Sequence, residues 1–178
     1  MKLHIGGKIK KDDWKILNIQ NKEDVDFIGD ISDLSQFEEE SINEIYASHV
    51  FEHVPQKKII STLSGINRVL KTGGKFYLSV PDIDVLFKFF LTPLTSYATK
   101  IGKTEGEIKM HILRIIFGGQ MDQYDFHYFG WNFGFLKSAL IKAKFTKIEK
   151  VINFNLFEDT SNYKPYGFPI SLNVVAFK

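Results

Sequence analysis

Short runs in which apolar and polar residues alternate recur along the chain. They predict β-strands, because successive side chains of a strand point to opposite faces. Such runs cover residues 3–5, 14–19, 25–28, 43–48, 75–80, 145–151 and 170–177. Turn residues bound several of them: Gly29-Asp30 follows the third run, and Pro81 stops the fifth. The pattern therefore predicts a sheet.

A different periodicity follows the fourth run. Apolar residues recur at helical spacing and share one face of a predicted helix: Ile59, Ile60, Leu63, Ile66, Val69 and Leu70. Pro55 suits the first turn of this helix, and Gly73-Gly74 suits its end. A strand, a helix and a strand with short joints predict a right-handed parallel crossover.

Residues 85–130 interrupt this alternation with helical segments that are mixed with aromatic residues and glycines. Beyond them, Asn132 can cap a helix that runs as far as Ala143. The stretch from Lys8 to Asp13 is too short for a crossover helix, so a bare loop is expected there. The whole pattern is typical of an open α/β sheet with layered helices, in a single domain of residues 1–178.

Composition narrows the classes of function. The 178 residues are 44% hydrophobic and 25% charged, with a net charge of +2, as in an ordinary globular protein. Arg68 and Arg114 are the only arginines, so nucleic acid is not an expected partner. The absence of cysteine excludes thiolate chemistry. No apolar run reaches membrane-spanning length and no signal peptide is visible, so a cytoplasmic enzyme or binding domain is expected, with its oligomeric state open.

Ligands of open α/β sheets bind outside the carboxyl ends of the strands. The candidate residues are those that end or directly follow the first five runs: Gly6-Gly7, Asn18, Gly29-Asp30, Ser48-His49 and Pro81-Asp82. Some of them also have a purely structural interpretation. Gly6-Gly7 can serve a turn that needs positive φ, and Asp30 can cap a turn.

Four stretches of this kind carry a resemblance to a known family. They read LHIGG (3–7), IGDISDL (28–34), EIYASHVFEHV (44–54) and RVLKTGGK (68–75). In this order and spacing, they make the chain similar to class I S-adenosylmethionine-dependent methyltransferases over nearly its whole length. The resemblance is closest to small predicted methyltransferases that begin with an LHIGG-like stretch.

The resemblance implies an open, mostly parallel Rossmann-like methyltransferase sheet with helices on both faces, an antiparallel last strand and a helical lid inserted after strand five. It implies S-adenosyl-L-methionine as the cofactor and S-adenosylhomocysteine as the product, with a small-molecule or saccharide-type acceptor. The cofactor-binding residues would be Gly6, Gly7, Asn18, Asp30, Ser48 and His49. Residues 85–131 would form the lid on the acceptor side, with Phe126, Tyr128 and Trp131 as its walls.

Two positions depart from the family pattern. The family's first motif usually has a longer glycine turn than Gly6-Gly7. Its second strand often ends in an acidic residue that holds the ribose hydroxyls, where this chain has Asn18, which can accept only through its carbonyl oxygen. A second function therefore stands beside the enzyme: a methyltransferase-fold binding or interaction module with weak or no cofactor binding.

Residues 49–53 read HVFEH and match the H-x-x-E-H zinc motif. That motif needs a helix that places both imidazoles on one face, and Pro55 would end such a helix at once. No metal site is therefore expected. Glu52 and His53 can instead form a polar floor of the pocket, or pair with each other and cap the next helix.

His127 lies in the aromatic stretch YDFHYFGW (124–131), which in this family's fold would overhang the transferred methyl group. Because histidine titrates near neutral pH, His127 is a candidate general base, and His53 is the other. The same stretch can also be a hydrophobic lid packed on the sheet. In-line methyl transfer requires the protein to position the acceptor, exclude water and, for a hydroxyl acceptor, remove a proton.

Overall fold

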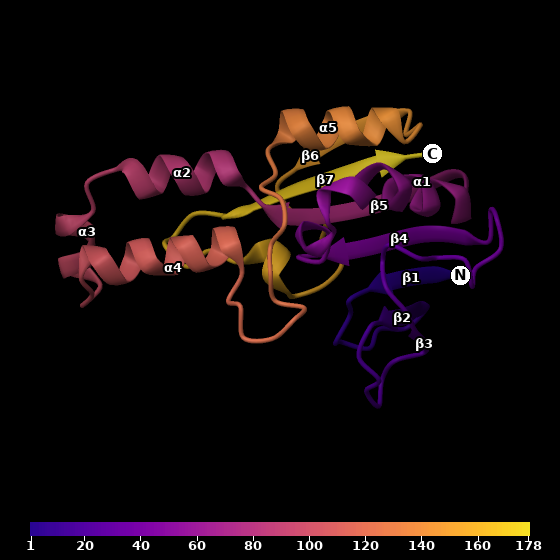
Figure 1. Cartoon of the computed structure of the whole chain (residues 1–178), viewed down its shortest axis with the longest axis horizontal. Helices are drawn as coiled ribbons and strands as arrows, with labels where there is room; N and C mark the ends of the chain where they lie inside the picture. The colour runs from indigo at the N-terminus through magenta and orange to yellow at the C-terminus, as the bar shows by residue number, and fades with distance from the viewer.

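The computed structural model describes all 178 residues. Seven strands form one sheet in the order β3-β2-β1-β4-β5-β7-β6 (Figure 1). The strands are β1 (Lys2–Ile5), β2 (Trp14–Asn18), β3 (Phe27–Ile28), β4 (Ile42–Ser48), β5 (Leu70–Pro81), β6 (Lys147–Val151) and β7 (Ser171–Phe177). β7 runs opposite to the other six strands and pairs antiparallel with β5 and β6, and all other pairs are parallel. The open, mostly parallel sheet with an antiparallel last strand is thus confirmed.

Five α-helices and three short 3-10 helices accompany the sheet. They are η1 (Phe51–His53), η2 (Gln56–Lys58), α1 (Ile59–Val69), α2 (Ile83–Leu91), α3 (Thr95–Lys100), α4 (Glu105–Phe117), α5 (Phe133–Lys142) and η3 (Thr160–Asn162). Helices α1 and α5 pack side by side, whereas α2, α3 and α4 project beyond the carboxyl end of β5 (Figure 1). None of the helices is both long and apolar enough to pass through a membrane.

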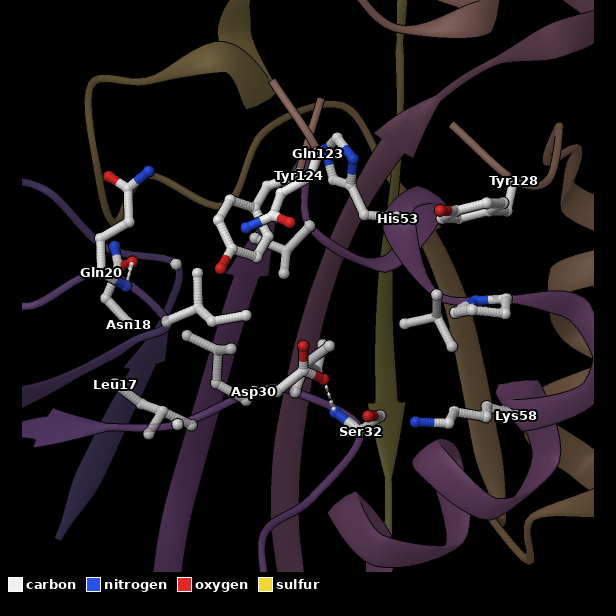
Figure 2. Close-up of a pocket in the computed structure, with 18 of the residues that line it drawn as sticks. Leu17, Asn18, Gln20, Asp30, Ser32, His53, Lys58, Gln123, Tyr124 and Tyr128 are labelled. Carbon is white, nitrogen blue, oxygen red and sulfur yellow. Dashed lines mark hydrogen bonds between the residues drawn. The ribbon is translucent and has the colours of Figure 1, made fainter. Parts of the chain in front are cut away.

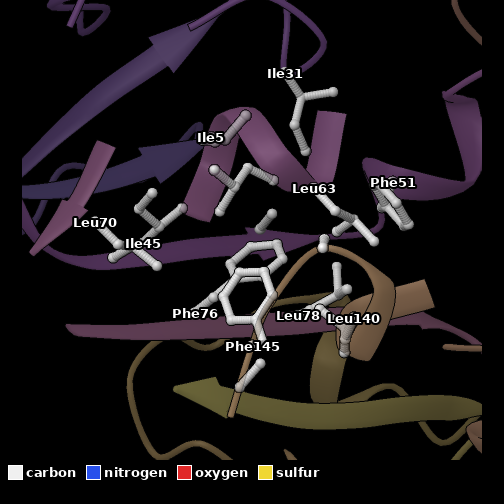
Figure 3. Packing of buried hydrophobic residues seen from close by; sticks show 14 of the residues in the cluster. Ile5, Ile31, Ile45, Phe51, Leu63, Leu70, Phe76, Leu78, Leu140 and Phe145 are labelled. Carbon is white, nitrogen blue, oxygen red and sulfur yellow. The ribbon is translucent and has the colours of Figure 1, made fainter. Parts of the chain in front are cut away.

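The main core lies between one face of the sheet and the helices α1 and α5. Alternate residues of β1, β5 and β7 enter this core of 28 buried residues, such as Leu3 and Ile5 of β1. Figure 3 shows Phe76 of β5 beside Phe145, and their ring centroids are 6.1 Å apart. Each such large apolar side chain contributes about 1.5–3 kcal/mol when it is fully buried. This layer fixes the strands whose ends form the site.

The opposite face of the sheet is covered by the C-terminal segment 152–168, which contains η3. Trp14, Tyr46 and Phe157 form a small aromatic core there. The hydroxyl of Tyr46 donates to a carboxylate oxygen of Asp159 at 2.8 Å, which joins the segment to the centre of the sheet. A chain segment with one short helix therefore covers this face of the sheet, whereas two longer helices, α1 and α5, cover the other.

The first four strands are joined without helices. The connection between β1 and β2 is a bare loop, as its length predicts. Residues 29–41, between β3 and β4, also lack a helix, yet they place Ile31, Leu34 and Phe37 in the main core. The carboxylates of Asp30 and Asp33 each accept from a backbone N–H two residues ahead, and these turns shape the loop.

The helix after β4 differs from its prediction at both ends. Pro55 is extended (ψ 141°), so a 3-10 turn intervenes before α1 begins at Ile59. The helix ends at Val69, because Leu70 is already extended and pairs with Ile42 of β4. Gly73-Gly74 therefore lies inside β5 and does not end the helix. The N-cap prediction holds, since Oδ1 of Asn132 accepts from the backbone N–H of Phe135.

Candidate functional site

A cavity of about 410 Å³ lies at the carboxyl ends of the parallel strands. The chain runs from β1 outward to β2 and β3, and then returns to place β4 on the other side of β1. The strand order thus reverses between β1 and β4, which is where open α/β sheets bind ligands. The walls come from the ends of β1 to β4, from the turn before α1, and from the loop 118–131 (Figure 2).

The two glycines after β1 are required by the fold. Gly6 has a φ of +74° and lines the cavity, but a Cβ on it would collide with Cγ2 of Val50. Gly7 is buried outside the cavity, and a Cβ there would meet the ring of His4. The short glycine turn is therefore set by packing against neighbouring side chains, and only Gly6 reaches the cavity.

Asn18 ends β2 and lines the cavity, and its amide is partly engaged within the chain. Only 8% of the residue is exposed. Nδ2 donates to the carbonyl of Gly7 at 3.1 Å, and Oδ1 accepts from the backbone N–H of Gln20 at 3.0 Å. One lone pair of Oδ1 and one N–H of Nδ2 remain. Asn18 thus holds the glycine turn against the end of β2, and half of the hydrogen-bonding positions of its amide are left for a ligand. Figure 2 shows Asn18 beside Gln20.

Asp30 presents a carboxylate to the cavity from the turn after β3. Its Oδ1 accepts from the backbone N–H of Ser32 at 2.7 Å, and its Oδ2 makes no hydrogen bond within the chain. Figure 2 shows Asp30 and Ser32 together on one side of the cavity, with Lys58 nearby. This side can therefore offer both an acceptor and a cation to a polar ligand.

Ser48 ends β4 and His49 follows it, but neither lines the cavity. His49 has a φ of +53°, which turns the chain there. Its Nε2 lies 2.9 Å from Oγ of Ser171 at the start of β7. Oγ of Ser48 is buried and has no hydrogen-bond partner. The next residue, Val50, does line the cavity, and the sequence pattern did not single it out.

Glu52 is the centre of a cluster of histidines behind the cavity wall. Only 1% of Glu52 is exposed. Its Oε1 lies 3.4 Å from Nδ1 of His49 and 3.9 Å from Nε2 of His127. The rings of His53 and His127 meet edge to face with centroids 4.7 Å apart. Burial acts to raise the pKa of Glu52, but the three histidines outweigh it and hold that pKa below its usual value.

The two candidate bases differ in position. His53 lines the cavity, whereas His127 is half-buried behind it. Burial lowers the pKa of His127, although the neighbouring Glu52 acts in the opposite direction. The stretch 49–53 is not an α-helix, since only a three-residue 3-10 turn, η1, forms there.

The loop 118–131 overhangs the cavity with one of the three side chains expected there, Tyr128, and with two others. Gln123, Tyr124 and Tyr128 line it (Figure 2). Phe126 does not line it, and Trp131 stacks on Phe51 in the main core with 2% of its surface exposed. The backbone N–H of Tyr128 donates to the carbonyl of Glu52 at 2.9 Å, so the loop is tied to the turn after β4.

Comparisons with known proteins agree with this architecture. Residues 10–78 match a family model described as a methyltransferase domain. A SAM-dependent methyltransferase from Archaeoglobus fulgidus is 14% identical, with a TM-score of 0.58 over 99% of this chain and 85% of that one. The 1,6-didemethyltoxoflavin-N1-methyltransferase of Burkholderia thailandensis, with S-adenosylhomocysteine bound, is 14% identical, with a TM-score of 0.59 over 99% and 70%.

A Haloferax volcanii complex of the Trm112 methyltransferase activator with its methyltransferase is also similar. It is 14% identical, with a TM-score of 0.53 over 99% of this chain and 81% of that one. No curated protein sequence matches the chain.

The chain has the fold of class I S-adenosylmethionine-dependent methyltransferases. The resemblance predicted from the sequence is confirmed to this extent, and the likeness to LHIGG-type members stays a prediction. In this methyltransferase fold, the structure brings Gly6, Asn18, Asp30 and His53 to one cavity, and leaves Gly7, Ser48, His49 and His127 outside its lining. The missed residues of the loop 118–131 had only their aromatic and polar composition as a signal.

Proposed function

We propose that the chain is an S-adenosylmethionine-dependent methyltransferase that binds its cofactor in the cavity between β1, β2 and β4. The observation that carries this proposal is the position of the cavity at the reversal of strand order, lined by the strand-end residues Gly6, Asn18 and Asp30. Its volume of about 410 Å³ suits a small-molecule ligand, since such pockets span about 300–1,000 Å³.

The cofactor supplies an electrophilic methyl group when it is bound, so the chain needs only to position, enclose and deprotonate. Asp30 would accept a hydrogen bond from the adenosine part through its Oδ2, while Gln20 lies close to Asn18 on the same wall. Gly7, Ser48 and His49 would act indirectly, by fixing the turns after β1 and β4. Asn18 would serve chiefly to hold the glycine turn through its bond to the carbonyl of Gly7.

His53 is the favoured base because it reaches the cavity. Its Nδ1 lies 3.0 Å from the carbonyl oxygen of Phe126, which can only accept, so the neutral ring carries its proton on Nδ1. Nε2 then keeps a lone pair that can take a proton from a hydroxyl acceptor. His127 remains the second candidate, and it would act from behind the wall through Glu52 or His53.

The acceptor would enter under the loop 118–131, as part of a lid formed by residues 85–131. Gln123, Tyr124 and Tyr128 reach the cavity from this loop. The two tyrosines offer aromatic rings and hydroxyl groups, and Gln123 offers an amide. Together they suit a small-molecule or saccharide-type acceptor, because they combine stacking with hydrogen bonding.

The rival function is a binding module that no longer holds the cofactor. The observation in its favour is Asn18, whose amide already makes two hydrogen bonds where the family often has a free carboxylate. Titration calorimetry with S-adenosylmethionine and S-adenosylhomocysteine decides between the two. Saturable binding below about millimolar supports the enzyme, and its absence refutes it, since ordinary substrate affinities are micromolar to millimolar.

Two matched variants locate the cofactor. Asp30→Asn should weaken binding roughly 10–100-fold, because a hydrogen bond to a charged group contributes about 1.5–3 kcal/mol. Asp33→Asn is the control: Asp33 makes the same kind of turn, with Ser35, but does not line the cavity. Equal affinities in the two variants would show that the cofactor does not bind beside Asp30.

A further inference from the structure

The carboxylate of Glu52 has no adequate partner inside the protein. The residue is 1% exposed, and neither Oε1 nor Oε2 makes a hydrogen bond. An ionised carboxylate removed from water costs several kcal/mol unless an opposite charge and hydrogen bonds compensate. The site therefore calls for a positive charge.

The hydrogen bonding of His49 fixes which ring nitrogen carries the proton when the imidazole is neutral. Oγ of Ser171 donates its single proton to the carbonyl of Thr160 at 2.9 Å, so it must accept from Nε2 of His49 at 2.9 Å. Neutral His49 thus carries a lone pair on Nδ1, and that atom lies 3.4 Å from Oε1 of Glu52. A lone pair that faces a carboxylate is repulsive unless a cation or a proton joins them.

His53 and His127 face the same carboxylate. One ring nitrogen from each of them and a carboxylate oxygen of Glu52 lie within 4.8 Å of one another. Nδ1 of His53 is bonded to the carbonyl of Phe126. Metal-bound histidines usually donate their second ring N–H to such a backbone carbonyl, which fixes the ring and leaves the other nitrogen for the metal. Nδ1 of His127 is buried without a hydrogen-bond partner.

We propose that Glu52, His53 and His127 bind a divalent transition-metal cation, for which Zn²⁺ is the reference. Two imidazoles and one carboxylate are a frequent ligand set for such ions. Ligand bonds of about 2.1 Å place tetrahedral ligand atoms about 3.4 Å apart, so the three side chains must close by about 1 Å. The bond from Tyr128 N–H to the carbonyl of Glu52 already holds the loop of His127 against the turn of Glu52.

The proposed site differs from the expectation that the H-x-x-E-H stretch binds no metal. The stretch supplies two ligands, Glu52 and His53, and the third comes from the loop 118–131. His49, the first histidine of the motif, stays on Ser171. Because His53 lines the cavity, a cation bound there could turn an open coordination position toward the acceptor. The cation would then lower the pKa of the acceptor hydroxyl and take the place of His53 as the base. This role rests on the proposed function, whereas cation binding does not.

The test is a metal titration of tag-free protein stripped with a chelator. Zn²⁺ is followed by calorimetry, and Co²⁺ by its visible absorption and by competition with Zn²⁺. We expect one equivalent to bind and to raise the melting temperature of the folded protein. Glu52→Gln and His127→Gln should each weaken binding at least about tenfold, the loss typical even of outer-shell changes.

His111→Gln is the matched control, because His111 bonds to Tyr166 in the small core of α2 to α4. It should bind as the unaltered chain does. Absence of saturable binding, unchanged affinity in Glu52→Gln, or equal loss in His111→Gln would each overturn the proposal. Affinity for S-adenosylhomocysteine, measured on the same metal-free samples, reports on the proposed function separately.

Discussion

His4 should make the protein sensitive to mild acid. The residue is 5% exposed and lies between Tyr46 and Phe157, with ring centroids at 4.9 and 4.3 Å. Its Nδ1 has no hydrogen-bond partner. Burial lowers the pKa of His4 from its usual 6.5 to about 4, against a smaller opposing effect of Asp159. Replacing His4 by Phe keeps an aromatic ring and removes the titration.

The magnitude follows from linkage between protonation and folding. The pKa is lower in the folded state, so the unfolded chain binds the proton first and folding is penalised as the pH falls. With pKa values of 6.5 and about 4, the penalty is about 0.2 kcal/mol at pH 7 and about 2.5 kcal/mol at pH 4.5. The penalty is thus small above about pH 6.5 and grows as the pH falls toward 4, so the free energy of unfolding decreases over that range.

Urea denaturation at pH 7.0 and 4.5 measures this effect. The loss of unfolding free energy between the two pH values should be about 2 kcal/mol smaller in His4→Phe than in the unaltered chain. Trp14→Phe changes a ring in the same aromatic core without removing a titrating group, so its loss should match that of the unaltered chain. A difference below about 0.5 kcal/mol between His4→Phe and Trp14→Phe would refute the reasoning, because it would mean that His4 titrates normally.

Two further predictions concern the site. Asn18→Asp should lower the unfolding free energy by about 1–3 kcal/mol, because it buries a carboxylate and breaks the bond to the carbonyl of Gly7; urea denaturation with and without S-adenosylhomocysteine separates this loss from a gain in affinity, and unchanged stability would contradict it. Gly6→Ala should cost about 1–3 kcal/mol more than Gly73→Ala, since both glycines have positive φ but only Gly6 would collide with Val50. Equal losses in thermal denaturation would show that Val50 yields.

The sequence predicted those elements of the fold that carry their own local signals. Asn132 supplies a cap with its own side chain, so the start of α5 follows from one residue and its successors. Gly73-Gly74 gave a wrong prediction of where α1 ends, because glycine commonly ends a helix. Here Leu70 pairs with Ile42 of β4, so the backbone becomes extended before it reaches the glycines. The side chain of Lys178, more than a hundred residues away in the sequence, donates to the carbonyl of Leu70 at 2.8 Å. Such distant contacts leave no mark on the local pattern.

The same contrast applies to the candidate site. The ends of parallel strands meet at one edge, so strand periodicity alone placed Gly6, Asn18 and Asp30 together. It could not show that positive φ turns His49 away from the cavity. Nor could it show that His127 lies beside Glu52, since that approach depends on how the loop 118–131 folds back over the turn after β4.

Helices α2, α3 and α4 enclose a small core of their own, to which the segment before β7 adds Tyr166 and Ile170. This core shares no residue with the main one. Parts of a protein with separate cores can open separately, at a lower free energy than global unfolding. Because the loop 118–131 begins where α4 ends, and the backbone N–H of His127 donates to the carbonyl of Phe117 in α4, loosening of these helices would release one of the two ties that position His127 while the sheet stays folded. Ligand entry and assembly of the histidine cluster would then depend on the local opening of α2, α3 and α4.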